Sequence, residues 1–245
     1  MSWIALLMVG VAVADLGHSV RPVRIVPECL GAGAAVLLGV GLCDLTGLRD
    51  VLALAVIAVV VLAWGHTVRQ GFGRNRASLP LALIGVAFAV AVVVAPAASP
   101  AGGLLEDWLA RDPLPVLDGL SADRVLALAA AFLVQLSTGN VLVRLVLAAT
   151  GTVNPAKVGG IDDPETQLKG GRLLGPMERV FILGLGLAGH LTAASIVIAA
   201  KGLLRFPELQ SKPDQARIHH LTEYFLVGSF VSWLVPLGSL VLLGT

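Results

Sequence analysis

The chain has 245 residues, of which 56% are hydrophobic and only 13% are charged, whereas about a quarter of a typical soluble domain is charged. Its mean hydropathy is +0.88. So few charged residues exclude a water-exposed surface for a fold of this length, and we expect lipid to cover most of the molecule. The net charge of +1 and the lack of a long basic tract argue against nucleic-acid binding.

Seven apolar stretches follow one another along the chain. A helix needs about 20 residues to cross a hydrocarbon core of about 30 Å, and most of these stretches meet that length. The sequence therefore predicts an all-α, polytopic transmembrane helical bundle of about six to seven spans, in a single integral membrane domain covering residues 1–245. The predicted spans, of which the first is short, lie at residues 2–20, 25–43, 48–67, 79–97, 123–150, 175–203 and 218–243.

Local signals mark where several of these helices begin. Ser121 offers a cap ahead of the fifth span, and Pro80 and Pro176 suit the first turns of the fourth and sixth spans. Between the fourth and fifth spans, residues 104–110 are predicted to form a short interfacial helix, with Trp108 at the headgroup level. Glycine and alanine are dense in the second and sixth spans, which predicts close helix packing there.

Polar residues inside the predicted fifth and sixth spans are the main functional candidates. An ionisable group at the bilayer centre costs several kcal/mol unless it is paired or hydrated. If the two spans are antiparallel neighbours, Gln135 lies at the depth of His190, which is near the middle of the sixth span. Arg144 then lies at the depth of Glu178. With Asn140, these residues are predicted to form a polar seam, in which Arg144 pairs with Glu178.

Charged residues also gather at the ends of the last two spans. Arg179 follows Glu178 at the start of the sixth span, Lys201 and Arg205 close it, and Glu223 lies near the start of the seventh. Lys201 and Glu223 are the natural pair. Two alternatives remain open, because cations are favoured at helix C-termini and anions at N-termini, and because long side chains can reach the interface without a partner.

Neither a metal site nor a cofactor is expected. His219 and His220 lie three to four residues from Glu223, which makes them weak metal candidates, but no third ligand accompanies them. Asp15 and His18, three residues apart near the end of the first span, are interpreted as a surface end-cap.

Three stretches in the last third carry a resemblance. They read Gly-Arg-Leu-Leu-Gly-Pro-Met-Glu-Arg at 171–179, Ala-Ala-Lys-Gly-Leu-Leu-Arg-Phe at 199–206 and Glu-Tyr-Phe-Leu-Val-Gly-Ser at 223–229. Together they resemble the C-terminal block of an uncharacterised bacterial family of multi-pass inner-membrane proteins, with Gly202 and Ser229 in place of the usual serine and threonine. The resemblance implies a bacterial cytoplasmic (inner) membrane, and it implies that five residues act as a set: Glu178, Arg179, Lys201, Arg205 and Glu223. It implies no activity.

Three functions fit these patterns. A small transporter or channel would use the polar seam as a hydrated path. A non-catalytic subunit or scaffold of a larger membrane complex would use the same charges to lock helices or hold a partner. An enzyme acting on lipid, the least favoured, would use Glu223 with His219 or His220. The expected partners are membrane lipid and either further copies of this chain or other membrane subunits. Water reaching His190 would favour transport.

Overall fold

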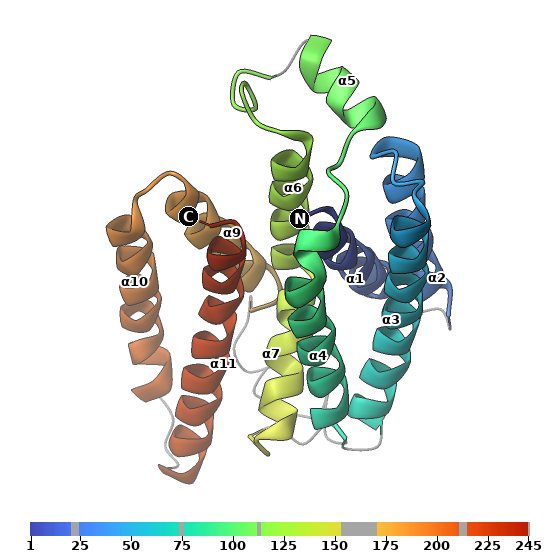
Figure 1. The fold of residues 1–245 in the computed structure, drawn as a ribbon. Coiled ribbons are helices and arrows are strands. Elements are labelled where there is room, and N and C mark those ends of the chain that lie inside the picture. Colours follow the sequence, from blue (N-terminus) through green and yellow to red (C-terminus); the bar gives the residue numbers. More distant parts are fainter. Residues whose placement is uncertain (21–24, 74–75, 112–113, 153–170, 211–214, 245) are drawn as a thin grey trace. The chain divides into compact units, whose positions relative to one another are not determined.

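A computed structural model describes residues 1–20, 25–73, 76–111, 114–152, 171–210 and 215–244 (Figure 1). Every regular element in these ranges is helical, which confirms the all-α class. The chain forms two compact units. Unit 1 comprises Met1–Arg69 and Leu79–Thr138, and unit 2 comprises Gln70–Ser78 and Gly139–Thr245. Each is described by itself.

Unit 1 is organised around its first helix. That helix contacts both the second and the sixth, and 67% of its residues are buried although it is as apolar as a membrane span. The N-terminal segment is therefore the centre of this unit. The elements are α1 (Ser2–Val20), α2 (Val26–Leu37), the π-helix η1 (Leu38–Leu42), α3 (Leu48–Gly73), α4 (Ser78–Val94), the 3₁₀ turn η2 (Ala95–Ala97), α5 (Gly103–Arg111) and α6 (Ala122–Leu136). Helix α3 belongs to this unit as far as Arg69.

Small residues bring α1 against its neighbours. A Cβ built on Gly31 of α2 would overlap the backbone oxygen of Gly10, and one on Gly10 would lie 2.7 Å from Val61 of α3. The helix axes approach closely only because these positions carry no side chain. The predicted small-residue packing of the second span is confirmed at Gly31, whereas Gly33 faces open space.

The described part of unit 2 contains three long helices and one shorter one. They are α7 (Thr138–Ala149), α9 (Gly171–Leu187), α10 (Leu191–Gln210) and α11 (Gln215–Leu242). Helix α9 contacts both α10 and α11. A Cβ on Gly186 of α9 would overlap the side chain of Leu240 of α11, so the predicted small-residue packing of the sixth span holds at this position.

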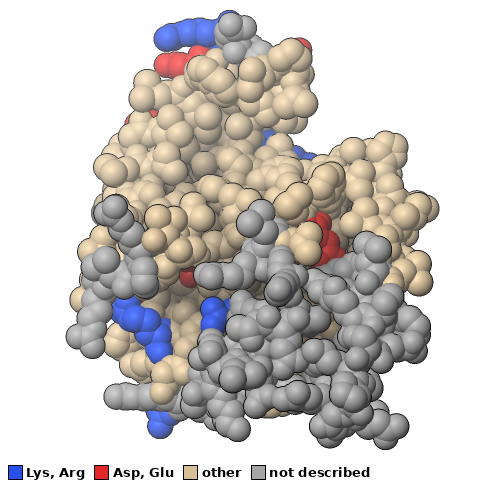
Figure 2. All heavy atoms as spheres, turned by 180° about the vertical axis from the view of Figure 1, so that it is seen from behind, with Lys and Arg blue, Asp and Glu red and all other residues tan. Residues whose placement is uncertain are grey.

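Among the described residues, four helices are long and apolar enough to cross a membrane, and a fifth span results if α6 and α7 count as one bent span. Helices α3 and α4 expose large apolar side chains, including Leu52, Val56, Val86 and Val93, and only 11% of the span containing α4 is buried. On the face shown in Figure 2, most of the described residues are uncharged. These features suit a lipid-covered surface, but six to seven spans are not confirmed within the described residues.

Two predicted spans are interrupted. The stretch at 123–150 breaks between α6 and α7 at Ser137, whose φ of −126° leaves the helical region. Ser, Thr and Gly follow one another here, and all three are weak helix formers. The stretch at 175–203 breaks at Gly189, whose φ is +78°. Hydrogen bonds from the His190 amide to Leu185 O (2.8 Å) and from the Gly189 amide to Gly186 O (3.0 Å) end α9 in a Schellman motif.

Smaller boundary predictions have mixed outcomes. The cap at Ser121 is confirmed, since its hydroxyl accepts from the Arg124 amide at 3.3 Å. The helix predicted at 104–110 is α5. Pro176 lies inside α9, not in its first turn, so that prediction is wrong. The span at 25–43 ends in a π-helical turn, in which the Cys43 amide donates to Leu38 O at 3.0 Å.

Candidate functional site

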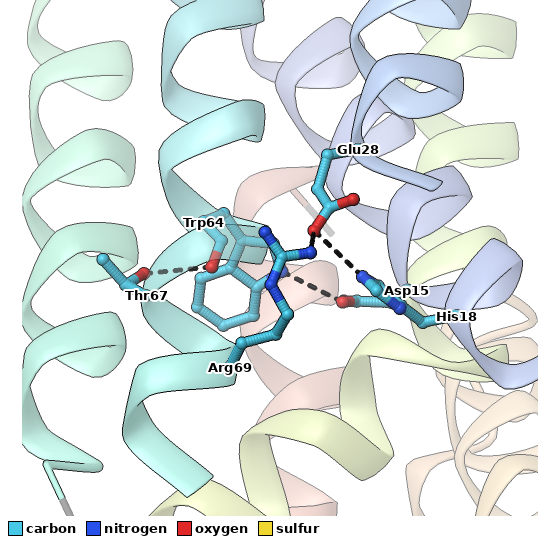
Figure 3. Close-up of polar contacts among 6 residues, drawn as sticks. All are labelled: Asp15, His18, Glu28, Trp64, Thr67 and Arg69. Atoms are coloured by element: carbon cyan, nitrogen blue, oxygen red, sulfur yellow. Dashed lines mark hydrogen bonds and ion pairs between the residues drawn. The ribbon is translucent and has the colours of Figure 1, made fainter. Parts of the chain in front are cut away.

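The densest group of buried charge in unit 1 lies where α1, α2 and α3 meet (Figure 3). Asp15 and His18 are three residues apart, which puts them on one side of α1. Glu28 lies in the first turn of α2, where an acidic side chain is favoured by the helix dipole. We call this group the acidic site. Its members are Asp15, His18, Glu28, Trp64 and Arg69.

Glu28 is almost completely buried, with 1% of its side chain exposed. Its Oε1 atom forms an ion pair with Arg69 of α3 and lies 3.1 Å from His18 Nε2. The other carboxylate oxygen, Oε2, is buried and accepts no hydrogen bond. Gly65 makes room for this arrangement, because a Cβ there would overlap the Glu28 side chain.

Asp15 is buried as well, with 3% exposure, but its surroundings differ. The indole Nε1–H of Trp64 donates to Asp15 Oδ1 at 3.0 Å. Asp15 Oδ2 accepts no hydrogen bond, and within the described residues no lysine or arginine forms an ion pair with Asp15. The interpretation of Asp15 and His18 as a surface end-cap is therefore wrong for Asp15.

Hydroxyl groups line the same region. Ser19 Oγ donates to the backbone oxygen of Asp15 at 3.0 Å and lies 2.9 Å from Ser137 Oγ. Thr138 lies beside the Asp15 carboxyl group, and its Oγ1 atom is also buried without a hydrogen-bond partner. The acidic site thus holds two carboxylate oxygens that are able to bind a proton or another cation, and the Thr138 hydroxyl beside it is a third such group.

Across the part of the chain that the structure describes, no group of three or more His, Cys, Asp or Glu residues is arranged to hold a metal ion. Hard cations such as Ca²⁺ take about six to eight oxygen ligands, far more than the acidic site offers.

A second buried charged group lies in unit 2. Arg179 of α9 is 1% exposed, and its guanidinium donates to Asn140 Oδ1 at 2.8 Å and to Ser232 Oγ at 3.1 Å. Next to it, Glu178 accepts from the Trp233 indole at 2.8 Å. A Cβ on Gly139 would overlap the Arg179 side chain, so glycine is required where α7 meets it. Arg179, predicted as a helix-end charge, is the centre of a buried hydrogen-bond network.

The predicted polar seam has a different arrangement. His190 is exposed in the turn between α9 and α10, so the prediction of one continuous helix through it is wrong. Gln135 belongs to unit 1 and donates to Ala131 O of its own helix at 2.8 Å. Arg144 is exposed, with its guanidinium carbon 5.1 Å from the centre of the Phe72 ring. Its pairing with Glu178 stays a prediction.

The remaining predicted residues lie mostly beyond what the structure describes. The side chains of Lys201, Arg205, His219 and His220 are outside the described residues, so the pairing of Lys201 with Glu223 stays a prediction. Glu223 itself is exposed, and Thr152 Oγ1 donates to its Oε1 atom at 3.5 Å.

Sequence reasoning missed Glu28, Trp64 and Arg69 altogether. Glu28 follows Pro27 near the start of an apolar stretch and reads as a first-turn acid, and Arg69 reads as part of a basic loop. The available signal was the number of ionisable residues at one membrane depth: Asp15 and His18 near the end of one span, Glu28 near the start of the next, and Arg69 near the end of the third.

Comparison of the chain with protein-family models, with curated proteins and with solved structures finds no match. The resemblance of residues 171–229 to a bacterial membrane-protein family therefore stays a prediction.

Proposed function

We propose that this chain is a small transport protein of the membrane and that the acidic site holds a cation on its way across. The observation that carries the proposal is the pair of buried carboxyl groups, Asp15 and Glu28, each with one oxygen that accepts no hydrogen bond. A buried polar atom left without a partner costs about 1–3 kcal/mol, and more when it is charged. Ionisable groups within membrane helices mark ion pathways and proton relays.

A purely structural role accounts less well for this arrangement. In a structural ion pair the charges are matched and the remaining oxygens are hydrogen-bonded. Arg69 matches the charge of Glu28, but the second oxygen of that carboxylate accepts no hydrogen bond, and Asp15 has no cationic partner among the described lysines and arginines. An unmatched acid in a helix core is a cost that packing alone does not require, since an apolar residue would fill the same space.

The proposal includes a location. We infer a bacterial cytoplasmic membrane from the resemblance at residues 171–229. We also propose six to seven spans, in which α2 with η1, and α9 with α10, add to the four or five apolar spans of the described helices. The shorter apolar helices Val26–Leu42 and Leu191–Ala200 support this count.

Ion flux into sealed vesicles tests the proposal. The purified chain is reconstituted in liposomes that contain a fluorescent reporter of H⁺, Na⁺ or K⁺, and a concentration gradient is imposed. We expect flux of one of these ions above that of empty liposomes. Asp15→Asn and Glu28→Gln should each abolish it, whereas Asp107→Asn, at an exposed position of α5, should leave it unchanged. If no ion moves faster than in empty liposomes, the proposal is wrong and a non-catalytic subunit becomes the better reading.

A further inference from the structure

The two carboxyl groups of the acidic site have unequal partners. Glu28 faces a guanidinium on α3 and an imidazole on α1, so its negative charge is balanced locally. The titratable groups that act on Asp15 are His18 on its own helix and Glu28 on α2. Arg69 is engaged with Glu28, and the neighbouring residues Trp64 and Thr138 are neutral. One carboxyl is held by ions, and the other by neutral hydrogen-bonding groups.

A carboxyl group that is buried among neutral groups and close to another carboxylate favours its protonated form. Protonation of Asp15 would also give its second carboxyl oxygen a hydrogen-bond partner. Asp15 Oδ2 and Thr138 Oγ1 are both buried without partners, and Thr138 lies beside the Asp15 carboxyl. A hydroxyl both accepts and donates. Thr138 is therefore able to accept from a protonated Oδ2 and, after rotation, to donate to an ionised one.

We propose that Asp15 carries an exchangeable proton, with Thr138 as the hydroxyl that serves both of its states, while Glu28 remains paired with Arg69 and His18. In the exchange step the O–H bond at Oδ2 breaks, the electron pair stays on the carboxylate, and the proton leaves to water. The inference rests on the proposed function and narrows it, since it makes the proton the cation that is bound. Asp15 is the binding residue, and Thr138 is a positioning residue.

Infrared spectroscopy of the folded protein tests this without any transport. A protonated carboxylic acid has a carbonyl stretching band separate from that of a carboxylate. We expect such a band, decreasing as the pH is raised, in wild type, in Glu28→Gln and in Asp107→Asn, and its loss in Asp15→Asn. A band that persists in Asp15→Asn, or the absence of any protonated carboxyl band in wild type, overturns the inference.

Two further measurements guard against misfolding and against another cation. Thr138→Val keeps Asp15 and should shift the frequency of the band, because the hydrogen bond of the acid is removed. An unshifted band contradicts the role of Thr138. Adding Na⁺ or K⁺ at constant pH should leave the band in place. Its conversion to a carboxylate band would show that a metal ion displaces the proton, which overturns the inference and leaves the proposed transport standing. If no ion flux is found but the Asp15 band behaves as expected, the proposed transport is wrong and the protonation of Asp15 stands.

Discussion

Both units bury charged side chains, but they surround them differently. In unit 2 the Arg179 guanidinium donates to Asn140 and Ser232, and Trp233 donates to Glu178. In unit 1 the acidic site leaves oxygens of Asp15 and Glu28 without a hydrogen-bond donor. The first arrangement has the features of a network that fixes helices, since its polar groups are joined across α7, α9 and α11. The second has unused binding capacity. Burial of charge alone therefore does not mark a functional site, and the partners of each polar atom have to be examined.

The largest expected effect is the loss of the arginine in unit 2. Arg179→Ala leaves the side chains of Asn140 and Ser232 without their donor and creates a cavity among α7, α9 and α11. We expect the free energy of unfolding to fall by about 3–5 kcal/mol, the range for breaking a buried charged network. Reversible unfolding in mixed detergent micelles measures this. Arg111→Ala, at an exposed position of α5, serves as the control and should change little. Equal effects of the two substitutions would contradict the comparison.

Glycine substitutions probe the close packing of each cluster. Gly139→Ala places a methyl group against the Arg179 side chain, and Gly65→Ala places one against Glu28. Overpacking of this kind costs about 1–3 kcal/mol. Gly184→Ala in α9 and Gly33→Ala in α2 are matched controls, because a Cβ meets nothing within 4 Å at either position. If the control substitutions destabilise the protein as much as the test substitutions, helix packing at the clusters is less tight than described.

Trp64→Phe removes the indole N–H that donates to Asp15 Oδ1 and preserves most of the aromatic volume. We expect the free energy of unfolding to fall by about 0.5–1.5 kcal/mol through the loss of this hydrogen bond. Reversible unfolding in mixed detergent micelles measures this change. In the double variant with Asp15→Leu the effect of Trp64→Phe should shrink, because the acceptor is gone. An undiminished effect would mean that the indole acts on stability through packing and not through Asp15.

The smallest effect on stability is expected for Asp15→Asn. An asparagine is close in shape to a protonated aspartic acid, accepts from Trp64 and donates to Thr138. We expect the free energy of unfolding to change by less than about 1 kcal/mol, although cation flux is lost. The small change in stability for Asp15→Asn and the large one for Arg179→Ala would distinguish the buried charges of the two units most clearly. Strong destabilisation by Asp15→Asn would place Asp15 with the structural charges.

Composition and run length were enough to predict an all-helical protein with apolar spans, because burial in lipid constrains every residue of a span. They did not predict the breaks. Ser137 and Gly189 each look tolerable within an apolar run, and whether the helix continues depends on tertiary partners such as Ser19 and on the C-terminal cap at Gly189. A count of apolar residues carries neither signal.

The candidate site was harder to predict for the same reason. Depth register between neighbouring spans led to Gln135 and His190, which the structure assigns to different units. An equal depth of Gln135 and His190 was predicted from one continuous sixth helix, whereas α9 ends at the cap formed by Gly189. The acidic site instead joins residues from three helices, and its recognition required knowing that α1 packs against both α2 and α3. Asn140, predicted as a member of the polar seam, accepts a hydrogen bond from Arg179.

The most direct test of the account is deuterium exchange at the Asp15 carboxyl group. The central claim is that a side chain with 3% exposure exchanges its proton with water while the protein stays folded. The folded chain in lipid is transferred from H₂O to D₂O, and the protonated carboxyl band that is absent from Asp15→Asn is followed by infrared spectroscopy. We predict that this band shifts to the deuterated frequency without loss of helical structure. A band that keeps its original frequency until the protein unfolds would contradict the claim and make Asp15 a structural residue.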